Sequence, residues 1–209
     1  MPITPETGHG PRDPKIVLVR HGETEWSRTH RHTGLTDIPL SQAGEYKAEI
    51  VGDELAGIPF GLVLTSPLLR ARETARLAGF PDALPDENLV EWDYGAYEGI
   101  TSTEIAERRG GPWSIWMDGV PPGETPGESA ADIKRRALAL RDRVHPHLEA
   151  GERVLLFSHG HFLRALAAVW LGLEVKDGSL LALDTAAIST LGYEHGRRVI
   201  ASWNRTPRR

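Results

Sequence analysis

The chain of 209 residues has no cysteine, which excludes disulfide bonds, thiolate metal ligands and thiol catalysis. It has no stretch that approaches the roughly 20 apolar residues of a membrane span. The first residues contain no apolar core of a secretory signal, so nothing indicates export and we expect a cytoplasmic protein without membrane contact. The formal net charge of −5 argues against general affinity for nucleic acid.

The composition changes along the chain and predicts how the chain is divided. Residues 1–14 hold four prolines and little apolar content, which indicates a disordered lead-in. Residues 15–204 suit a single domain, within which we expect a flap rich in Trp, Pro and Gly at about 92–128. Residues 205–209 form a basic tail that we expect to be solvated.

Segments that are apolar along their whole length predict strands buried on both faces. The clearest are residues 15–20, 60–64 and 153–157, with a shorter candidate at 88–91 and two strand-like runs within 180–203. Amphipathic helices are expected between them. The sequence therefore predicts the α/β class: a three-layer α/β/α sandwich whose mostly parallel central sheet has helices on both faces.

Capping residues predict where the helices begin. Ser41 is placed to start a helix through about residue 56, and Ser129 a long helix. Ser66 followed by proline predicts a third start. The remaining helices are expected at 101–109 and from about Gly160, and a loop broken by Gly and Pro at 25–40.

Several of the predicted strands end in residues that can carry chemistry. Because the carboxyl ends of parallel strands share one edge of a sheet, two arginines and two histidines would meet there and form a pocket for a dianion. Local arginines can attract an anion to a chain of negative net charge. Gly22 would allow a sharp turn and a close approach of the ligand, and the helix near Gly160 would add backbone N–H donors. The strand ends are Arg20-His21-Gly22, Ser66 with Arg70, Glu91, and Ser158-His159-Gly160.

Such a pocket can transfer a phosphoryl group. A neutral imidazole attacks phosphorus when its other ring nitrogen is held by an acceptor, and His21 is the candidate nucleophile. The arginines and His159 would neutralise charge on the phosphoryl oxygens. Glu91, which lies between Val and Trp, is placed to give the leaving alkoxide its proton. Arg70 could instead pair with Glu73 or Glu91.

Four motifs in this order resemble the histidine phosphatase superfamily, also called the phosphoglycerate-mutase-like fold. The resemblance covers nearly the whole chain from about Lys15 onward. It implies that His21 accepts the phosphoryl group, and that Glu91 is the proton donor. It also implies that the phosphoryl group is bound by Arg20, Arg70 and His159. The motifs are Arg20-His21-Gly22-Glu23-Thr24, Ser66-Pro-Leu-Leu-Arg70, Glu91-Trp-Asp-Tyr-Gly-Ala-Tyr-Glu-Gly99 and Ser158-His159-Gly160-His161.

The same resemblance implies a set of substrate contacts. Thr33 and Gly34 match a substrate-contacting pair of the family. Ser27 and His161 stand where the family often has asparagine, and His161 is either a satisfied polar residue or part of the pocket wall. The candidate substrate-binding residues are Ser27, Thr33, Gly34, Tyr94, Gly160 and His161.

Two pairs of histidines have a spacing that metal ligands use. No acidic cluster lies beside His30-x-His32 or His159-x-His161, and the chemistry implied by the resemblance needs neither a metal nor another cofactor. We therefore expect no metal site and no cofactor, and we interpret His30 and His32 as loop residues near the mouth of the pocket.

The acceptor of the phosphoryl group separates two activities. A mutase must hold a second substrate anion, and the mutases of this family use paired arginines shortly before a proline run. Here Arg108-Arg109 come too early after Glu91, and the four residues before Pro121-Pro122, residues 117–120, include no cation. We therefore favour water as the acceptor and a phosphatase as the activity. A phosphoglycerate mutase and an inactive phosphate-binding module are the alternatives.

Longer segments narrow the resemblance. Residues 32–40, 91–95, 112–119 and 159–164 together look like the branch that contains sedoheptulose-1,7-bisphosphatase, and residues 91–95 also resemble broad-specificity acid phosphatases of actinobacteria. A small phosphomonoester, and first a sugar phosphate, is the expected substrate and partner. The two tryptophans at 113 and 116 either cover its other end or anchor the flap. The sequence leaves the oligomeric state open, a homodimer included.

Overall fold

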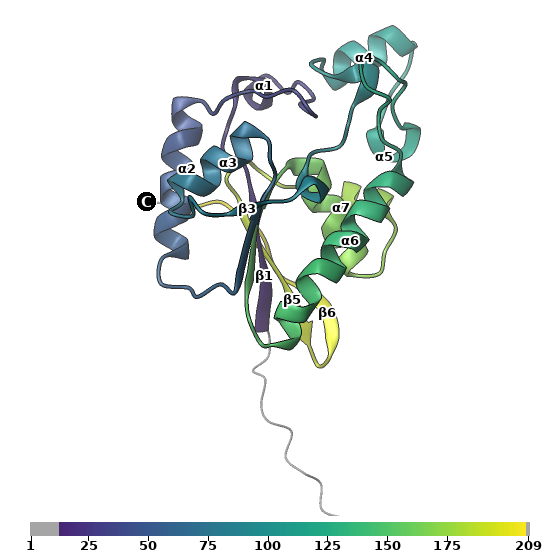
Figure 1. The fold of residues 1–209 in the computed structure, drawn as a ribbon. Helices are drawn as coiled ribbons and strands as arrows, with labels where there is room; N and C mark the ends of the chain where they lie inside the picture. The colour runs from purple at the N-terminus through teal and green to yellow at the C-terminus, as the bar shows by residue number, and fades with distance from the viewer. Residues whose placement is uncertain (1–12, 208–209) are drawn as a thin grey trace, which may run out of the picture.

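The computed structural model describes residues 13–207 as one six-stranded sheet between layers of helices (Figure 1). The strand order is β3-β2-β4-β1-β5-β6, and β1 to β4 run parallel, whereas β5 pairs antiparallel with β1 and β6 pairs antiparallel with β5. This confirms the predicted α/β sandwich. The strands are β1 (Asp13–Arg20), β2 (Leu62–Thr65), β3 (Leu84–Pro85), β4 (Val154–Ser158), β5 (Ile188–Glu194) and β6 (Arg197–Arg205).

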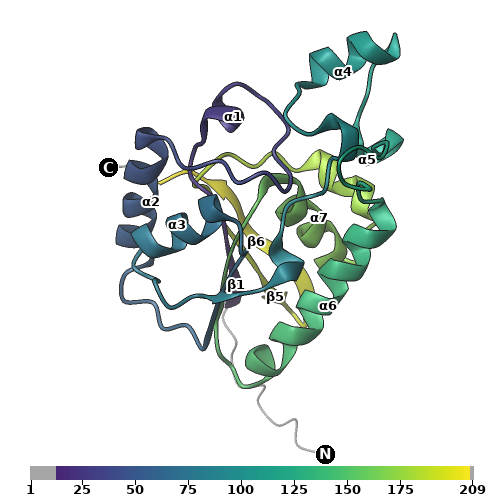
Figure 2. The ribbon, with the colours of Figure 1, turned by 45° about the horizontal axis from the view of Figure 1, so that its top comes forward.

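Helices cover both faces of the sheet and the edge where the parallel strands end. The pair α2 and α3 lies on one face and the pair α6 and α7 on the other, while α1 and α4 lie beyond the carboxyl ends of the strands (Figures 1 and 2). The α-helices are α1 (Glu25–Arg28), α2 (Gln42–Leu55), α3 (Leu69–Leu77), α4 (Ser102–Arg109), α5 (Ile115–Asp118), α6 (Ala130–Glu149) and α7 (Gly160–Trp170). The 3₁₀-helices are η1 (Glu87–Leu89), η2 (Gly95–Tyr97) and η3 (Val175–Leu180).

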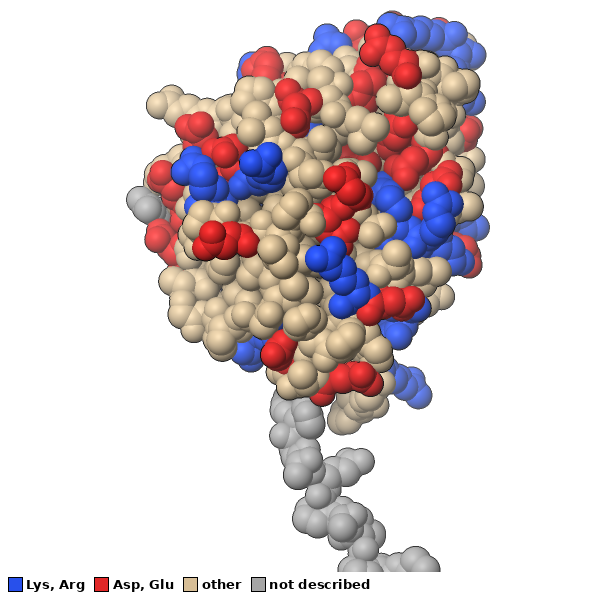
Figure 3. All heavy atoms as spheres, viewed as in Figure 1, with Lys and Arg blue, Asp and Glu red and all other residues tan. Residues whose placement is uncertain are grey.

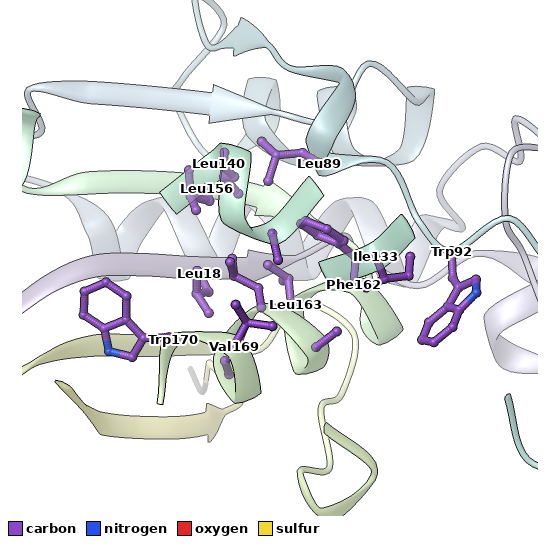
Figure 4. Packing of buried hydrophobic residues seen from close by; sticks show 14 of the residues in the cluster. Leu18, Leu89, Trp92, Ile133, Leu140, Leu156, Phe162, Leu163, Val169 and Trp170 are labelled. Atoms are coloured by element: carbon purple, nitrogen blue, oxygen red, sulfur yellow. The ribbon is translucent and has the colours of Figure 1, made fainter. Parts of the chain in front are cut away.

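The central strands divide their side chains between two hydrophobic cores. In β1, Ile16 and Leu18 face the core under α6 and α7, whereas Val17 and Val19 face the core under α2. Successive side chains of a strand point to opposite faces, so both faces of β1 are buried and its sequence is apolar throughout. Figure 4 shows the larger core, in which Leu18 and Leu156 of the sheet meet Leu140, Phe162 and Leu163 of the two helices.

The predicted helix starts are confirmed at two of three serines. The Ser41 hydroxyl accepts a hydrogen bond from Gly44 N at 3.1 Å and caps α2, and Ser129 forms a capping box with Asp132 at the start of α6. The start predicted at Ser66 is wrong, because α3 begins three residues later, at Leu69. Ser66 is turned instead toward the residues at the strand ends.

Three further expectations of local structure are wrong. The expected loop at 25–40 contains the helix α1, which the Thr24 side chain caps. The strand expected at 88–91 is absent, since η1 covers residues 87–89 and the edge strand β3 lies earlier in the chain. Arg205, predicted to be the first residue of the tail, is the last residue of β6 and pairs with Glu54 at 2.8 Å, although its side chain is exposed as expected. Strand β1 begins at Asp13, and the first twelve residues of the expected lead-in lie outside the described residues.

The sequence predicted no general affinity for nucleic acid and no membrane contact. The surface charges and the helices of the described residues concern these two expectations. On the face in Figure 3, Lys and Arg side chains are interspersed with Asp and Glu side chains. None of the helices between residues 13 and 207 is long and apolar enough to cross a membrane.

Gly22 is required by a close approach of two backbones rather than by an unusual φ. A Cβ atom added to Gly22 would lie 2.5 Å from Gly44 O, and one added to Gly44 would overlap Glu23 O. Gly22 N also donates to the Thr74 hydroxyl at 2.9 Å, so the turn after β1 is held between α2 and α3. The room that we expected at Gly22 for a ligand is therefore taken by α2.

We expect Gly44→Ala to lower the free energy of unfolding by about 2 kcal/mol or more, because the new methyl group forces the turn at Glu23 away from α2. Gly111→Ala is the matched control, since a Cβ there meets nothing within 4 Å. Its effect should stay within about 0.5 kcal/mol. Urea unfolding of both variants measures the difference, and equal stabilities would contradict the close approach.

Candidate active site

The ends of three parallel strands bring the predicted residues together. Arg20 of β1 is in register with Ser158 of β4, and Thr65 of β2 with Phe157 of β4. His21 N donates to Ser158 O and Ser66 N to Phe157 O, each at 2.9 Å. The residue that follows each strand therefore starts from the same edge of the sheet, as expected for parallel strands.

His21 is buried and held in one orientation. Its Nδ1 lies 2.7 Å from Gly22 O, a carbonyl that can only accept, so Nδ1 carries the proton and Nε2 carries the lone pair. Burial, and next the nearby cations Arg70 and Arg20, lower the pKa of His21 well below its usual value. The imidazole is therefore neutral at neutral pH, with Nε2 available as a nucleophile.

His159 lies beside His21, with 5.2 Å between the ring centroids. Its Nδ1 accepts from Arg70 Nε at 3.1 Å, so its Nε2 donates to the Ser66 hydroxyl at 2.8 Å. Burial and the charge of Arg70 lower the pKa of His159 well below its usual value. Ser66 was noted only as a strand end and a helix cap, and its contact with His159 is a role that the sequence did not reveal.

Arg70 is fully buried and fixed by backbone carbonyls. Its Nη2 donates to Thr33 O at 3.1 Å and to Gly34 O at 2.7 Å, and its Nη1 donates to Thr36 O at 2.9 Å. It pairs with neither of the two glutamates that the sequence offered. The loop after α1 is thus fastened to α3 through one guanidinium group that keeps its charge.

Arg20 and Gly160 lie against each other at the ends of β1 and β4. Arg20 Nη1 donates to Leu183 O at 2.6 Å, whereas the buried Arg20 Nε has no hydrogen-bond partner among the described residues. A Cβ on Gly160 would lie 3.2 Å from the Arg20 guanidinium carbon. Glycine at 160 therefore lets the helix α7 begin directly beside this cation.

Glu91 is bound by the first turn of α7. Its Oε1 accepts from Trp92 N and Phe162 N at 2.9 Å, and its Oε2 accepts from His161 N at 3.0 Å. The two carboxyl oxygens thus satisfy three backbone N–H groups, two of which belong to the first turn of α7 and have no partner within the helix. Two of the helix N–H groups that we expected to face a ligand are thus occupied by Glu91, and Gly160 N stays near the cavity.

A cavity of about 300 Å³ opens in front of these residues. It is lined by Arg20, His21 and Glu91, while Arg70 and His159 are fully buried behind them. Five of the six candidate substrate-binding residues also line it, namely Ser27, Thr33, Tyr94, Gly160 and His161. The histidines at 30 and 32 line it as well, in agreement with their expected place near its mouth.

Gly34 and Ser27 have structural contacts that the sequence did not predict. Gly34 is buried away from the cavity, since its N–H donates to both carboxylate oxygens of Glu98 at 2.9 Å and its carbonyl accepts from Arg70. The Ser27 hydroxyl accepts from Thr24 N at 2.9 Å and completes the capping box of α1. Of these two, Ser27 alone reaches the cavity.

His161 is both a satisfied polar residue and part of the cavity wall. Its Nδ1 lies 2.6 Å from the Tyr94 hydroxyl, and its ring lies 5.2 Å from that of Trp116. Burial, and next Arg164, lower its pKa well below the usual value, and burial lowers the pKa of His32 to about 4. Burial and the charge of Glu91 raise the pKa of Tyr94 well above its usual value. These groups are therefore uncharged at neutral pH.

The tryptophans of the expected flap support the wall from behind. Trp116 packs edge-on against Trp92 at 5.6 Å, and Trp113 packs against His32 at 5.1 Å. The sequence Pro-Gly-Glu occurs twice after them, at residues 122–124 and 126–128. This Pro-Gly-Glu repeat is bound to the buried Asp93, which accepts from the Thr125 hydroxyl at 2.5 Å. These contacts favour the anchoring interpretation of the two tryptophans.

Sequence reasoning missed a partly buried ion pair behind Glu91. Arg136 donates to Glu128 at 2.8 and 2.7 Å, and its other N–H groups donate to the carbonyls of residues 88, 90 and 91 at 2.9 to 3.3 Å. Its guanidinium carbon lies 4.6 Å from the centre of the Phe162 ring. All five donors of Arg136 are used, so this pair fixes the backbone that carries Glu91.

The pairs His30-x-His32 and His159-x-His161 have a spacing that metal ligands use. In the part of the chain that the structure describes, no three His, Asp or Glu side chains gather in a metal-binding arrangement. Both ring nitrogens of His159 are bound by protein groups, Arg70 and Ser66.

The sequence is similar to a known protein family and to known phosphatases. The family model described as histidine phosphatase superfamily (branch 1) matches residues 16–206. An acid phosphatase of Mycobacterium tuberculosis is 39% identical over 194 residues, which cover 92% of this chain and 93% of that protein. The sedoheptulose 1,7-bisphosphatase of Saccharomyces cerevisiae is 36% identical over 188 residues, 78% of this chain and 69% of that protein.

Mutases are also among the similar proteins. A 2,3-bisphosphoglycerate-dependent phosphoglycerate mutase of Gloeobacter violaceus is 37% identical over 162 residues, 72% of this chain and 73% of that protein. In three dimensions, the solved structure of an open reading frame product of Mycobacterium tuberculosis matches with a TM-score of 0.87 and 38% identity. The match covers 94% of this chain and all of that chain.

We expect Arg136→Gln to lower the free energy of unfolding by about 2 kcal/mol or more, because it leaves the partly buried Glu128 without its cation and three carbonyls without their donor. The amides of Trp92 and Phe162, which bind Glu91, should lose hydrogen-exchange protection in the same variant. Arg135→Gln is the control, since the neighbouring Arg135 side chain is 71% exposed. If both variants were equally stable, the ion pair would not hold this segment.

Proposed function

We propose, from the premise that this chain belongs to the histidine phosphatase superfamily, that it hydrolyses small phosphomonoesters through a phosphohistidine intermediate on His21. One observation carries the proposal: Arg20, whose buried Nε has no hydrogen-bond partner among the described residues, lines the cavity beside a neutral His21 whose Nδ1 is fixed by Gly22 O. A buried donor without an acceptor is costly, and a phosphoryl oxygen supplies that acceptor.

The first step transfers the phosphoryl group to the protein. Nε2 of His21 forms a bond to phosphorus while the bond from phosphorus to the ester oxygen breaks, and Glu91 gives its proton to that leaving oxygen. Arg20 and the Gly160 N–H are placed to bind the phosphoryl oxygens. The buried cation Arg70 and the His159 ring stand behind them and stabilise the charge that spreads over these oxygens.

The second step releases phosphate. Water attacks the phosphohistidine, its proton passes to the Glu91 carboxylate, and the bond between nitrogen and phosphorus breaks. Inorganic phosphate leaves, and His21 is again the neutral imidazole with Glu91 protonated. The two steps together consume the phosphomonoester and one water molecule, and they need no other reactant.

Water is favoured over a second substrate as the acceptor. Arg108 and Arg109, the pair that would suggest a mutase, lie at the end of α4, where Arg109 contacts Asp118 at 3.4 Å, and neither lines the cavity. The similar acid phosphatase and sedoheptulose 1,7-bisphosphatase support hydrolysis, and the second of them supports a sugar phosphate. A cavity of about 300 Å³ with a mostly polar lining fits a molecule of that size.

We expect His21→Ala to lower kcat/KM for p-nitrophenyl phosphate at least about 10³-fold, because the nucleophile is lost. Wild-type protein incubated with ³²P-labelled substrate and quenched in base should carry an acid-labile, base-stable label that His21→Ala lacks. His145→Ala, an exposed position on α6, is the control and should behave as wild type.

The same preparation separates the alternatives. Phosphate release without any added acceptor supports a phosphatase. Interconversion of 3- and 2-phosphoglycerate faster than phosphate release would replace the proposal with a mutase. Binding of phosphate with neither labelling nor turnover would indicate an inactive module.

We expect Glu91→Gln to affect substrates according to their leaving group. An alkyl phosphate such as glycerol 3-phosphate needs a proton on its leaving oxygen, and its kcat should fall by about 10² to 10⁴. p-Nitrophenolate leaves without a proton, so kcat for p-nitrophenyl phosphate should fall much less. Equal losses for both substrates would rule out Glu91 as the general acid and leave the role of His21 untouched.

A further inference from the structure

Glu98 lies against the loop that holds Arg70, although no role was assigned to it from the sequence. Both of its carboxylate oxygens accept from Gly34 N at 2.9 Å, and its Oε1 also accepts from Thr36 N at 3.2 Å. The side chain is half-buried and does not line the cavity in front of His21. Any effect of Glu98 on chemistry in that cavity must therefore pass through the groups that it binds.

The loop binds Arg70 on its other side, where Arg70 Nη2 donates to Thr33 O at 3.1 Å. The N–H of the same peptide group is Gly34 N, which donates to Glu98. Gly34 O and Thr36 O accept from Arg70 as well, at 2.7 and 2.9 Å. Hydrogen bonds in a chain polarise one another, so an N–H bound by a carboxylate makes its carbonyl a stronger acceptor. One peptide group therefore joins the carboxylate to the guanidinium group.

Backbone contacts place the Glu98 carboxylate against this loop. Gly99 N donates to His32 O at 2.8 Å and His32 N donates to Ile100 O at 3.0 Å, so the two segments are paired. A Cβ on Gly34 would lie 2.6 Å from Glu98 Oε2, so glycine lets the loop approach the carboxylate this closely. This contact accounts for glycine at position 34.

The orientation of Arg70 depends on the loop. All three guanidinium nitrogens are held, Nε by His159 Nδ1 at 3.1 Å and the other two by the loop carbonyls. The plane of the guanidinium group, and with it the place of the charge, changes if the loop moves. Burial lowers the pKa of Arg70, and the charges of Glu91 and, more weakly, Glu98 act in the opposite direction.

We propose that Glu98 is a positioning residue for phosphoryl transfer. Through the peptide group between Thr33 and Gly34 it holds the loop carbonyls that orient Arg70, the cation behind the transferring phosphoryl group. Glu98 itself contacts neither the substrate nor the nucleophile. This rests on the proposed function, because it assumes that the phosphoryl group lies at His21, in front of Arg70.

Glu98→Gln tests this role with a side chain of the same shape. The amide carries no charge, and its NH2 group would face a loop N–H that needs an acceptor. We expect kcat to fall about tenfold or more for p-nitrophenyl phosphate and glycerol 3-phosphate alike, because the charge near phosphorus is stabilised whichever group leaves. KM should change less than about threefold. A loss confined to glycerol 3-phosphate would indicate a role in proton transfer, as expected for Glu91, and would contradict the proposal.

Orthovanadate gives a readout that a smaller folded fraction would not change. It binds as an analogue of the transferring phosphoryl group, so its inhibition constant should rise about tenfold in Glu98→Gln. Glu98→Asp keeps the charge on a shorter side chain and should change kcat and the inhibition constant in the same direction but by less. Glu124→Gln is the matched control, since Glu124 is exposed, and it should keep both wild-type values.

A double-mutant cycle shows whether Glu98 acts through Arg70. Arg70→Lys keeps a positive charge and loses the planar set of donors that the loop binds. If the two residues act as one unit, kcat of the double variant should equal that of Arg70→Lys within about twofold. Losses that multiply would show that Glu98 acts elsewhere and would overturn the proposal.

The remaining outcomes separate this proposal from the proposed function. If wild type released phosphate and Glu98→Gln kept its kcat and its inhibition constant for orthovanadate, the positioning role would be wrong and the phosphatase would stand. If Arg70→Lys were inactive, a fall of kcat in Glu98→Gln without a rise of the inhibition constant would overturn the role, and a joint change would support it. If Glu98→Gln failed to fold, as judged by circular dichroism, the same two measurements on Glu98→Asp would decide. Absence of phosphate release by wild type from every substrate would instead overturn the phosphatase.

Discussion

Backbone carbonyl oxygens hold the arginines at the cavity, and the other features of the site depend on this choice of partner. Arg20 is bound by the carbonyl of Leu183, Arg70 by three carbonyls of the loop after α1, and Arg164 by two carbonyls of η3. A carboxylate would orient a guanidinium group as well, but it would cancel the charge. Carbonyls fix the geometry and leave a cation for an anionic ligand. Arg136, which does pair with a carboxylate, is the one of these arginines that faces away from the cavity and serves the backbone behind Glu91.

This concentration of positive charge also determines the state of the histidines. Burial and the neighbouring cations both disfavour imidazolium, so His21 and His159 are neutral where a protonated ring would be useless as a nucleophile. Because His21 Nδ1 is committed to Gly22 O, the lone pair must lie on Nε2. The proposed anion clamp and the proposed nucleophile therefore depend on one electrostatic arrangement, and weakening the cations would affect both.

The sequence predicted the parts of the site that lie on regular strands. Arg20, His21 and His159 follow apolar runs, and parallel pairing brought them together as expected. Glu91 was proposed as the end of a fourth strand, and the family resemblance implied the same role, but the strand on which we placed it is absent. The contacts of Arg136 and Arg164 left no trace in the pattern, because each joins residues far apart in the chain through carbonyls that every residue possesses. Such partners carry no side-chain signature, so they cannot be recognised without the fold. The assigned roles of the site residues stay predictions.

The division between strand ends and loops also bears on specificity. The groups assigned to phosphoryl transfer start from β1, β2 and β4 or are bound to the first turn of α7, so neighbouring strands and a helix fix their positions. The rest of the lining comes from α1 and the loop after it, from the start of α4, from α7 and from Leu183. The Pro-Gly-Glu repeat at residues 122–128 is bound to Asp93, and none of its residues lines the cavity. Variation in these loops can therefore change which molecule is held without moving His21 or Arg20.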